Sequence, residues 1–211
     1  MVDASVMTNN LTAADEIADE KLLTNSLILR AQQGDLQAFD QIIIKQQRRV
    51  ITLAWRMLGN KDDARDAAQD VFIRVYKNLS KVDPDRDFSG WIYRITINVC
   101  RDLARARNRH SRLSLEEEIE AGNMTEPVSL DNTESSAIYN QEQMIIARAL
   151  ATLTEKERAA ITLRDLEGLP GDEVARILGS SPTTVRSQIS SARSKIKIFR
   201  ERWLKKGASN K

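Results

Sequence analysis

Apolar residues recur every three to four positions over most of the chain, and this helical period limits the possible folds more than any other feature of the sequence. The clearest stripe runs from Phe39 to Met57 and stops at Gly59, a residue type that commonly ends helices. Asn60 can cap a further helix whose apolar stripe follows directly. Aromatic residues make up only 5% of the chain, which suits helices better than sheets. The sequence therefore predicts an all-α protein.

The helical period fades once, in a stretch rich in acidic and hydroxyl residues that also holds a glycine and a proline. We therefore predict two small helical domains joined by a flexible acidic linker over residues 111–135. The first is an N-terminal helical bundle over residues 23–110, and the second is a C-terminal four-helix domain over residues 136–206. Residues 1–22 lack a sustained apolar stripe and are expected to form a mobile extension, and residues 207–211 a tail.

The two predicted domains each carry a basic block, although the formal net charge of the whole chain is only +2. One block spans residues 101–112, the other spans residues 186–206, and the acidic segment 116–134 lies between them. This distribution favours two anion-binding modules joined by a segment that avoids the anion.

Residue types that enzymes and metal sites usually need are scarce. Cys100 is the single cysteine and His110 the single histidine, so a disulfide, a zinc cluster or a catalytic triad is not expected. The sequence also lacks a phosphate-binding loop and a dinucleotide glycine fingerprint. We therefore expect no enzyme activity, no metal and no cofactor, and we interpret Cys100 as a buried structural thiol.

The hydropathy pattern bears on localisation. The first twenty residues are polar and acidic, without the apolar core of a secretory signal. The most apolar stretch, residues 41–58, is interrupted by Lys45, Arg48 and Arg49 and should not span a bilayer. The chain is expected to be soluble and cytoplasmic.

The second domain contains the pattern of a helix-turn-helix motif. Thr154 and Glu157 form a capping box that opens a helix ending at Glu167. A short helix over residues 172–178 and a glycine turn follow, and Pro182 occupies the first position of the last helix.

The last helix has two distinct faces on a helical wheel. Val185, Ile189, Ala192 and Ile196 share a narrow apolar face that should pack on the domain. Hydroxyl residues lie opposite with basic residues beside them, a slim face that fits a DNA major groove. A solvated surface helix is the alternative interpretation, but the glycine turn, the proline start and the basic flank together favour DNA binding.

Two blocks of the chain resemble extracytoplasmic-function (ECF) sigma factors, a family of bacterial RNA polymerase sigma factors. Their C-terminal promoter-reading domain is similar to the stretch RDLEGLPGDEVARILGSSPTTVRSQISSARSKI. Their N-terminal domain is similar to AFDQIIIKQQRRVITLAWRMLGNKDDARDAAQDVFIRVYKNL followed by DFSGWIYRITINVCRDLARARNR. The blocks occur in the family's order, with a linker where the family has one.

The resemblance implies a sigma factor that directs promoter recognition, DNA melting and transcription initiation for a stress or envelope-response regulon. The implied partners are core RNA polymerase, promoter DNA and an anti-sigma factor, without a small-molecule substrate or insertion into a membrane.

The resemblance also implies site residues. The expected polymerase-binding residues are Asp66, Gln69, Asp70 and Arg74. The expected minus-ten DNA residues are Trp91, Tyr93, Arg94, Asn98, Arg101 and Arg105, with the loop over residues 82–88 as a pocket for an extruded base. The expected minus-thirty-five DNA residues are Thr183, Thr184, Arg186, Ser187, Ser190, Arg193 and Lys197. Two alternatives stay open: Trp91 as a core residue, and the carboxylates as mere solvation of their helix.

Some positions depart from the family's usual pattern. Residues 170–172 replace a serine-aromatic-acid start of the helix-turn-helix, and Thr183 replaces a usual glycine. Gln188 and Ser191 stand where basic residues are common, and Asp70 replaces the commoner glutamate. The resemblance therefore carries the fold but not a promoter sequence.

Two other functions also fit a helix-turn-helix with a helical companion domain. An ordinary repressor or activator would bind a palindrome as a dimer without polymerase. A protein-binding adaptor would not need the last helix for DNA. A hydrolase or transferase lacks a plausible nucleophile, base and metal set.

Overall fold

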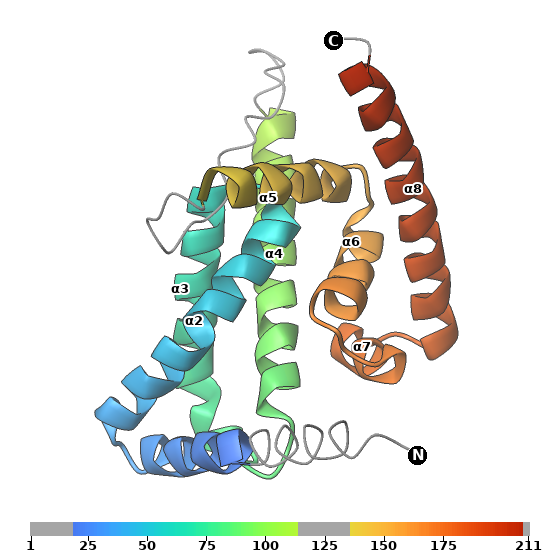
Figure 1. Ribbon diagram of the computed structural model, residues 1–211. Coiled ribbons are helices and arrows are strands. Elements are labelled where there is room, and N and C mark those ends of the chain that lie inside the picture. The colour runs from blue at the N-terminus through green and yellow to red at the C-terminus, as the bar shows by residue number, and fades with distance from the viewer. Residues whose placement is uncertain (1–18, 114–135, 209–211) are drawn as a thin grey trace, which may run out of the picture.

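The structure, a computed structural model, describes residues 19–113 and 136–208 (Figure 1). Within these ranges all regular elements are helices and no strand is present. The N-terminal part consists of a helix over residues 19–32, α2 (Leu36–Leu58), α3 (Lys61–Asn78), the 3-10 turn η1 (Leu79–Lys81) and α4 (Phe88–Leu113). The C-terminal part consists of α5 (Ser136–Ala151), α6 (Glu155–Ile161), the π-helical turn η2 (Thr162–Leu166), α7 (Gly171–Leu178) and α8 (Pro182–Ala208). The predicted all-α fold, with a helical bundle and a four-helix domain, is confirmed.

Local capping residues explain where the N-terminal helices begin and end. Gly59 ends α2 with φ of +73°, a left-handed conformation that favours glycine. The side-chain oxygen of Asn60 then accepts hydrogen bonds from the backbone N–H groups of Asp62 (2.8 Å) and Asp63 (3.1 Å). Asp87 caps α4 in the same way by accepting from the N–H of Gly90 at 3.0 Å.

The core of the N-terminal part lies where α2, α3 and α4 pack together. Small residues on α3, among them Ala64 and Ala67, are fully buried and let the neighbouring helices approach closely. Cys100 of α4 is buried as well, and burial raises the pKa of its thiol to about 12. The prediction that Cys100 is buried is therefore confirmed.

The C-terminal part forms the predicted helix-turn-helix, with one local difference. The capping box of Thr154 and Glu157 is present. The helix expected to run on to Glu167 instead changes to π-helical geometry after Ile161. Further along, the hydroxyl of Ser181 accepts from the N–H of Thr184 at 3.1 Å and starts α8. Figure 1 shows α8 on the outer side of α6 and α7, away from α2 and α3.

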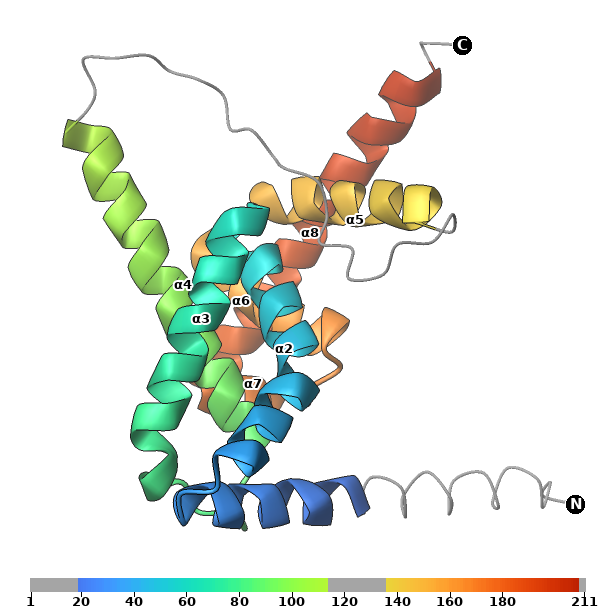
Figure 2. The ribbon, with the colours of Figure 1, turned by 90° about the vertical axis from the view of Figure 1, so that its left-hand side faces the viewer.

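The two parts of the chain pack against each other, which the sequence did not predict. α6 and α7 lie beside α2 and α4 (Figures 1 and 2), and one apolar core includes buried residues from both parts. The expected extension overlaps the first helix at residues 19–22, while residues 1–18 lie outside the described part. The expected linker begins inside α4 for residues 111–113, and its remainder also lies outside the described part. None of the helices in the described ranges is long and apolar enough to cross a membrane.

Replacement of a core leucine should test this packing. Leu53 on α2 is fully buried, so Leu53→Ala should lower the free energy of unfolding by about 2–5 kcal/mol through lost apolar contact and a residual cavity. Ile44 on the same helix is 65% exposed, and Ile44→Ala should change stability by less than about 0.5 kcal/mol. Urea unfolding followed by circular dichroism measures both changes, and equal losses would contradict the proposed core.

Candidate nucleic-acid and polymerase interfaces

The outward face of α8 is the first candidate interface. Val185, Ile189 and Ala192 are buried against the domain, as the helical wheel predicted. All of the residues expected to contact the minus-thirty-five element are exposed: Thr183, Thr184, Arg186, Ser187, Ser190, Arg193 and Lys197. The helix therefore presents hydroxyl and basic side chains from a rigid apolar base.

A buried carboxylate anchors α8 to α6. Glu157 accepts from the ammonium group of Lys195 at 2.7 and 2.8 Å and from the hydroxyl of Ser191 at 2.6 Å. It also accepts from the backbone N–H and the hydroxyl of Thr154, both at 2.9 Å. The hydrogen bonds from Lys195, Ser191 and Thr154 lower the pKa of Glu157 to about 2. Ser191 is thus engaged within the domain, although family members often carry a basic residue there.

The side chain of Arg193 is oriented by an ion pair with Asp165. Its guanidinium donates to both carboxylate oxygens of Asp165 in η2, at 2.9 and 2.7 Å, and this pairing raises its pKa further. Between the start of α7 and α8 lies a hollow of about 560 Å³, lined by Arg164, Arg186 and Arg193 among others. The hollow and its arginines form a basic entrance beside the hydroxyl face of α8, suited to a phosphate backbone.

The outward face of α3 is the second candidate interface. Asp66, Gln69 and Asp70 are exposed, while Arg74 is half-buried and donates to Asp102 of α4 at 3.2 Å. Ile73, which was not among the residues predicted from the sequence, is 50% exposed. Ile73 follows Asp66 by seven positions and Asp70 by three, so it shares their face, opposite the buried side of the helix. A helical wheel of α3 would have singled it out, because it is an apolar residue outside the apolar stripe.

Four of the expected minus-ten residues lie on one side of α4. Arg94, Asn98 and Arg105 are exposed, and Trp91 is half-buried against Phe88 with 5.7 Å between ring centroids. Trp91 and Asn98 line a hollow of about 250 Å³ between α3 and α4, next to the loop that precedes α4. Trp91 is therefore partly exposed, and this position is compatible both with a role in the core and with contact to an extruded base.

The other two expected minus-ten residues face the C-terminal part. The side chain of Tyr93 is buried, and its hydroxyl donates to Glu167 at 2.9 Å. Arg101 donates to Glu155 of α6 at 2.8 Å. The six expected residues therefore do not form one accessible surface in this arrangement. The hydrogen bonds that hold Arg101 and Tyr93 against the C-terminal part join residues 54 and 74 positions apart in the sequence. A local sequence pattern cannot predict contacts over such separations.

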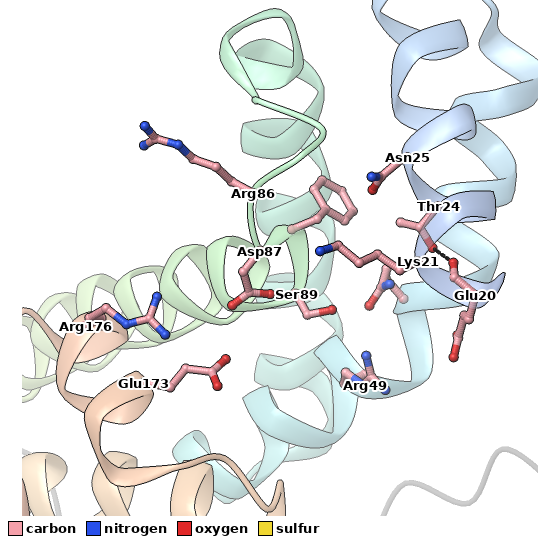
Figure 3. A pocket seen from close by; sticks show the side chains of 12 residues that line it. Glu20, Lys21, Thr24, Asn25, Arg49, Arg86, Asp87, Ser89, Glu173 and Arg176 are labelled. Atoms are coloured by element: carbon pink, nitrogen blue, oxygen red, sulfur yellow. Dashed lines mark hydrogen bonds between the residues drawn. The ribbon is translucent and has the colours of Figure 1, made fainter. Parts of the chain in front are cut away.

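The loop expected to receive an extruded base borders a cavity of about 570 Å³ (Figure 3). Gln32 fixes the start of this loop by donating to the carbonyls of Leu79 (2.9 Å) and Val82 (2.7 Å). Figure 3 shows Asp87 at the end of the loop, with the carboxylate of Glu173 from α7 close to it. Burial, and then the neighbouring Asp87 carboxylate, raise the pKa of Glu173. The cavity thus has walls from both parts of the chain.

In the part of the chain that the structure describes, histidine, cysteine, aspartate and glutamate residues nowhere gather in a group of three or more that could hold a metal ion.

Comparisons with known proteins agree with both blocks. The family model for Sigma-70 region 2 matches residues 43–110, and the model for Sigma-70, region 4 matches residues 143–196. The chain is 34% identical over 180 residues to the ECF RNA polymerase sigma-E factor of Escherichia coli strain K12. This alignment covers 84% of the chain and 94% of that protein.

Solved structures show the same fold. The structure of CnrH in complex with the cytosolic domain of CnrY matches with 27% identity and a TM-score of 0.61, covering 85% of this chain and 97% of that chain. The sigma factor RpoE from Bartonella quintana, solved as a co-crystal with the anti-sigma factor NepR, matches with 21% identity and a TM-score of 0.63. That match covers 77% of this chain and 96% of the other, and it concerns the fold alone.

The anchoring role of Glu157 predicts a pH-dependent stability. Its folded-state pKa lies below the ordinary value of 4.5, so its stabilising effect is complete above about pH 4.5 and is lost as pH falls toward 2. Glu157→Gln should therefore lower Tm clearly at pH 6, and the difference from the wild type should shrink as the pH is lowered to 3. Glu201→Gln, at an exposed position of α8, is the control and should leave Tm nearly unchanged. A Tm difference for Glu157→Gln that does not vary with pH would contradict this role.

Proposed function

The chain belongs to the ECF sigma factors, and from this premise we propose that its exposed faces divide promoter recognition between its two helical parts. It is a sigma factor, which binds core RNA polymerase and directs transcription initiation at promoters, and the family resemblance is confirmed. In our proposal α3 binds the polymerase, α4 engages the minus-ten element and α8 reads the minus-thirty-five element. The observation that carries it is the outward face of α8, where hydroxyl and basic side chains stand exposed on a buried apolar base.

The polymerase-docking surface in this proposal consists of Asp66, Gln69, Asp70 and Ile73, with Arg74 at its edge. The apolar side chain of Ile73 is surrounded by polar side chains, and protein interfaces commonly have such an apolar centre and polar rim. The carboxylates of Asp66 and Asp70 would favour a basic partner surface and speed its approach. The contact between Arg74 and Asp102 supports α3 from behind by tying it to α4.

The minus-ten surface in this proposal consists of Trp91, Arg94, Asn98 and Arg105, on the accessible side of α4. Separating the strands costs on average about 1.4 kcal/mol per base-pair step. Stacking one extruded base on an aromatic side chain returns roughly 1–3 kcal/mol, and arginine–phosphate contacts add to this. Trp91 beside the loop over residues 82–88 supports such a stacking role, and nucleotide hydrolysis is not needed.

Five further points belong to the proposal. Sigma factors are non-catalytic initiation factors, and we extend this to the absence of any enzyme activity in this chain. We place the chain in the cytoplasm, where a sigma factor meets RNA polymerase, and we assign it a stress or envelope-response regulon. An anti-sigma partner is implied by the family resemblance, and the relative CnrH was solved in complex with a second protein segment, the cytosolic domain of CnrY. We retain residues 23–110 and 136–206 as the two domains.

Substitutions on the polymerase-docking surface should weaken binding to core polymerase without unfolding the chain. Ile73→Ala removes the apolar centre, and Gln69→Ala with Asp70→Ala removes part of its rim. We expect each variant to bind core polymerase at least about tenfold more weakly and to give less run-off transcript at limiting protein, with unchanged helicity and Tm. Ile44→Ala, at an exposed isoleucine of α2, is the matched control for Ile73→Ala and should bind like the wild type. Wild-type affinity in both test variants would rule out this surface.

Substitutions on α8 should separate base reading from phosphate binding. Arg186 and Ser187 lie near the start of the helix, where a recognition helix reaches base edges. Replacing either by alanine should change the preferred base at one or two minus-thirty-five positions and cost about 1–3 kcal/mol on the best sequence. Lys197→Ala and Arg200→Ala should weaken all promoters about equally and reduce the salt slope by about one unit each.

The measurement is transcription by holoenzyme on a randomised promoter library at several salt concentrations. A uniform loss for Arg186→Ala would mean that α8 does not read bases as proposed. The absence of any effect from all four substitutions would remove DNA binding from this domain and favour a protein-binding adaptor.

A further inference from the structure

The C-terminal part contains a hollow whose apolar lining the proposed function does not use. It measures about 450 Å³ and lies where α5, α6 and α8 meet, beside η2 (Figure 1). Sites for small molecules commonly have volumes of about 300–1,000 Å³. Six apolar side chains line it: Ile146, Ala149, Leu150, Ile161, Leu166 and Ile196. We call it the α5–α8 hollow.

The α5–α8 hollow has a buried floor and an accessible wall. Leu150 and Ile161 are buried and belong to a small apolar cluster that is separate from the main core. Leu166 of η2, in contrast, is 37% exposed. Arg148 of α5 lies over the ring of Trp203 of α8, 5.4 Å from its centroid, and this cation–π contact helps to hold two of the walls together. The hollow is therefore already formed in the free protein, with apolar surface open to solvent.

The exposed edge of the hollow carries an excess of positive charge. Arg193, Lys197 and Arg200 line it from α8, and their spacing of four and three positions places them on one side of the helix. Asp165 compensates only Arg193, to which it is bound at 2.7 Å. In the described ranges, neither Lys197 nor Arg200 takes part in an ion pair. Two cations are therefore available to an anionic group beside an apolar hollow.

We propose that the α5–α8 hollow binds an anionic amphiphile of the fatty-acid class, with its alkyl chain against the apolar walls and its carboxylate between Lys197 and Arg200. The alkyl chain and the walls both lose contact with water on binding, which supplies the driving force. The carboxylate accepts charge-assisted hydrogen bonds from the two basic side chains. An extended peptide would bring backbone N–H and C=O groups that apolar walls leave without partners, whereas an alkyl chain needs none.

Occupancy of the hollow should also weaken DNA binding, and this part of the inference rests on the proposed function. Lys197 and Arg200 are the residues proposed to contact DNA phosphates. A carboxylate held by both would neutralise charge that otherwise releases counterions from the DNA. Because phosphates carry no sequence information, a bound amphiphile should weaken all promoters about equally.

The binding test uses the free, full-length protein and decanoate, titrated by calorimetry at neutral pH. Butyrate keeps the carboxylate but shortens the chain, and decan-1-ol keeps the chain but lacks the charge. We expect one decanoate per protein chain, with butyrate binding at least about tenfold more weakly and decan-1-ol at least about threefold more weakly.

Two substitutions locate the site. Leu166→Ser removes part of the apolar wall and should weaken decanoate binding at least about fivefold. Arg200→Gln removes one of the two cations and should weaken it about threefold, an effect that fades at high salt. Leu204→Ser and Arg202→Gln are the matched controls, because they change exposed residues of α8 that do not line the hollow. Both controls should bind decanoate like the wild type, and circular dichroism should show unchanged helicity in all four variants.

Three results would overturn the site: no binding of decanoate, butyrate binding as tightly as decanoate, or decanoate affinity that neither Leu166→Ser nor Arg200→Gln changes. The effect on DNA is tested separately, by the affinity of holoenzyme for promoter DNA with and without decanoate. We expect decanoate to lower the affinity of wild-type holoenzyme at least about threefold and to affect Leu166→Ser holoenzyme much less.

Binding of decanoate without a loss of promoter affinity would overturn the competition with DNA and leave the site in place. If the wild type directs no transcription at all, the proposed function fails, yet calorimetry still decides whether the α5–α8 hollow binds the amphiphile.

Discussion

The apolar core that α2, α3 and α4 share with α6 and α7 is the constraint on which the rest of the structure depends. None of these helices buries its apolar face alone, and α6 and α7 have only seven and eight residues, too few to be stable in isolation. Packing against neighbours therefore decides the position of each helix. Small residues such as Ala64 and Ala67 allow close approach within the N-terminal part. The contact of α7 with α4 extends the same core across the two parts.

Charged groups at the edge of this core fix particular helices because burial makes an unpaired charge costly. Glu157 fastens α8 to α6 through Lys195 and Ser191. Arg158, whose pKa is lowered by burial, donates to the backbone carbonyls of Leu150, Leu153 and Met57 and so ties α5, α6 and α2 together. Glu167 accepts hydrogen bonds from Arg56 of α2 and Tyr93 of α4, and so ties the segment after η2 to both helices. This anchoring leaves the outward face of α8 exposed, as the proposed DNA contact requires.

The same geometry decides which functional surfaces are accessible. A sigma factor must present separate surfaces to polymerase and to two promoter elements, and the packed arrangement of the two parts exposes only some of the surfaces proposed here. The proposed polymerase-docking surface and the outward face of α8 are accessible, whereas Tyr93 and Arg101 bond to Glu167 and Glu155. The polar contacts at Glu167 and Glu155 lie at the edge of the apolar core that both parts share, and the apolar contacts keep the two parts packed together.

The sequence by itself determined the helices, their ends and the inward face of α8, because these depend on residues within a few positions of one another. Gly59, Asn60 and the capping box of Thr154 act locally, and the spacing of Val185, Ile189 and Ala192 defines a face without any partner. The tertiary structure alone decided how the two parts meet and which residues of α4 remain accessible. Tyr93 and Glu167 are 74 positions apart, and a helical wheel shows that Tyr93 lies off the side shared by Trp91 and Asn98 but not what faces it. The exposure of Ile73 lies between these cases: its place on the wheel is visible in the sequence, but only the packed structure shows that none of the described helices covers it.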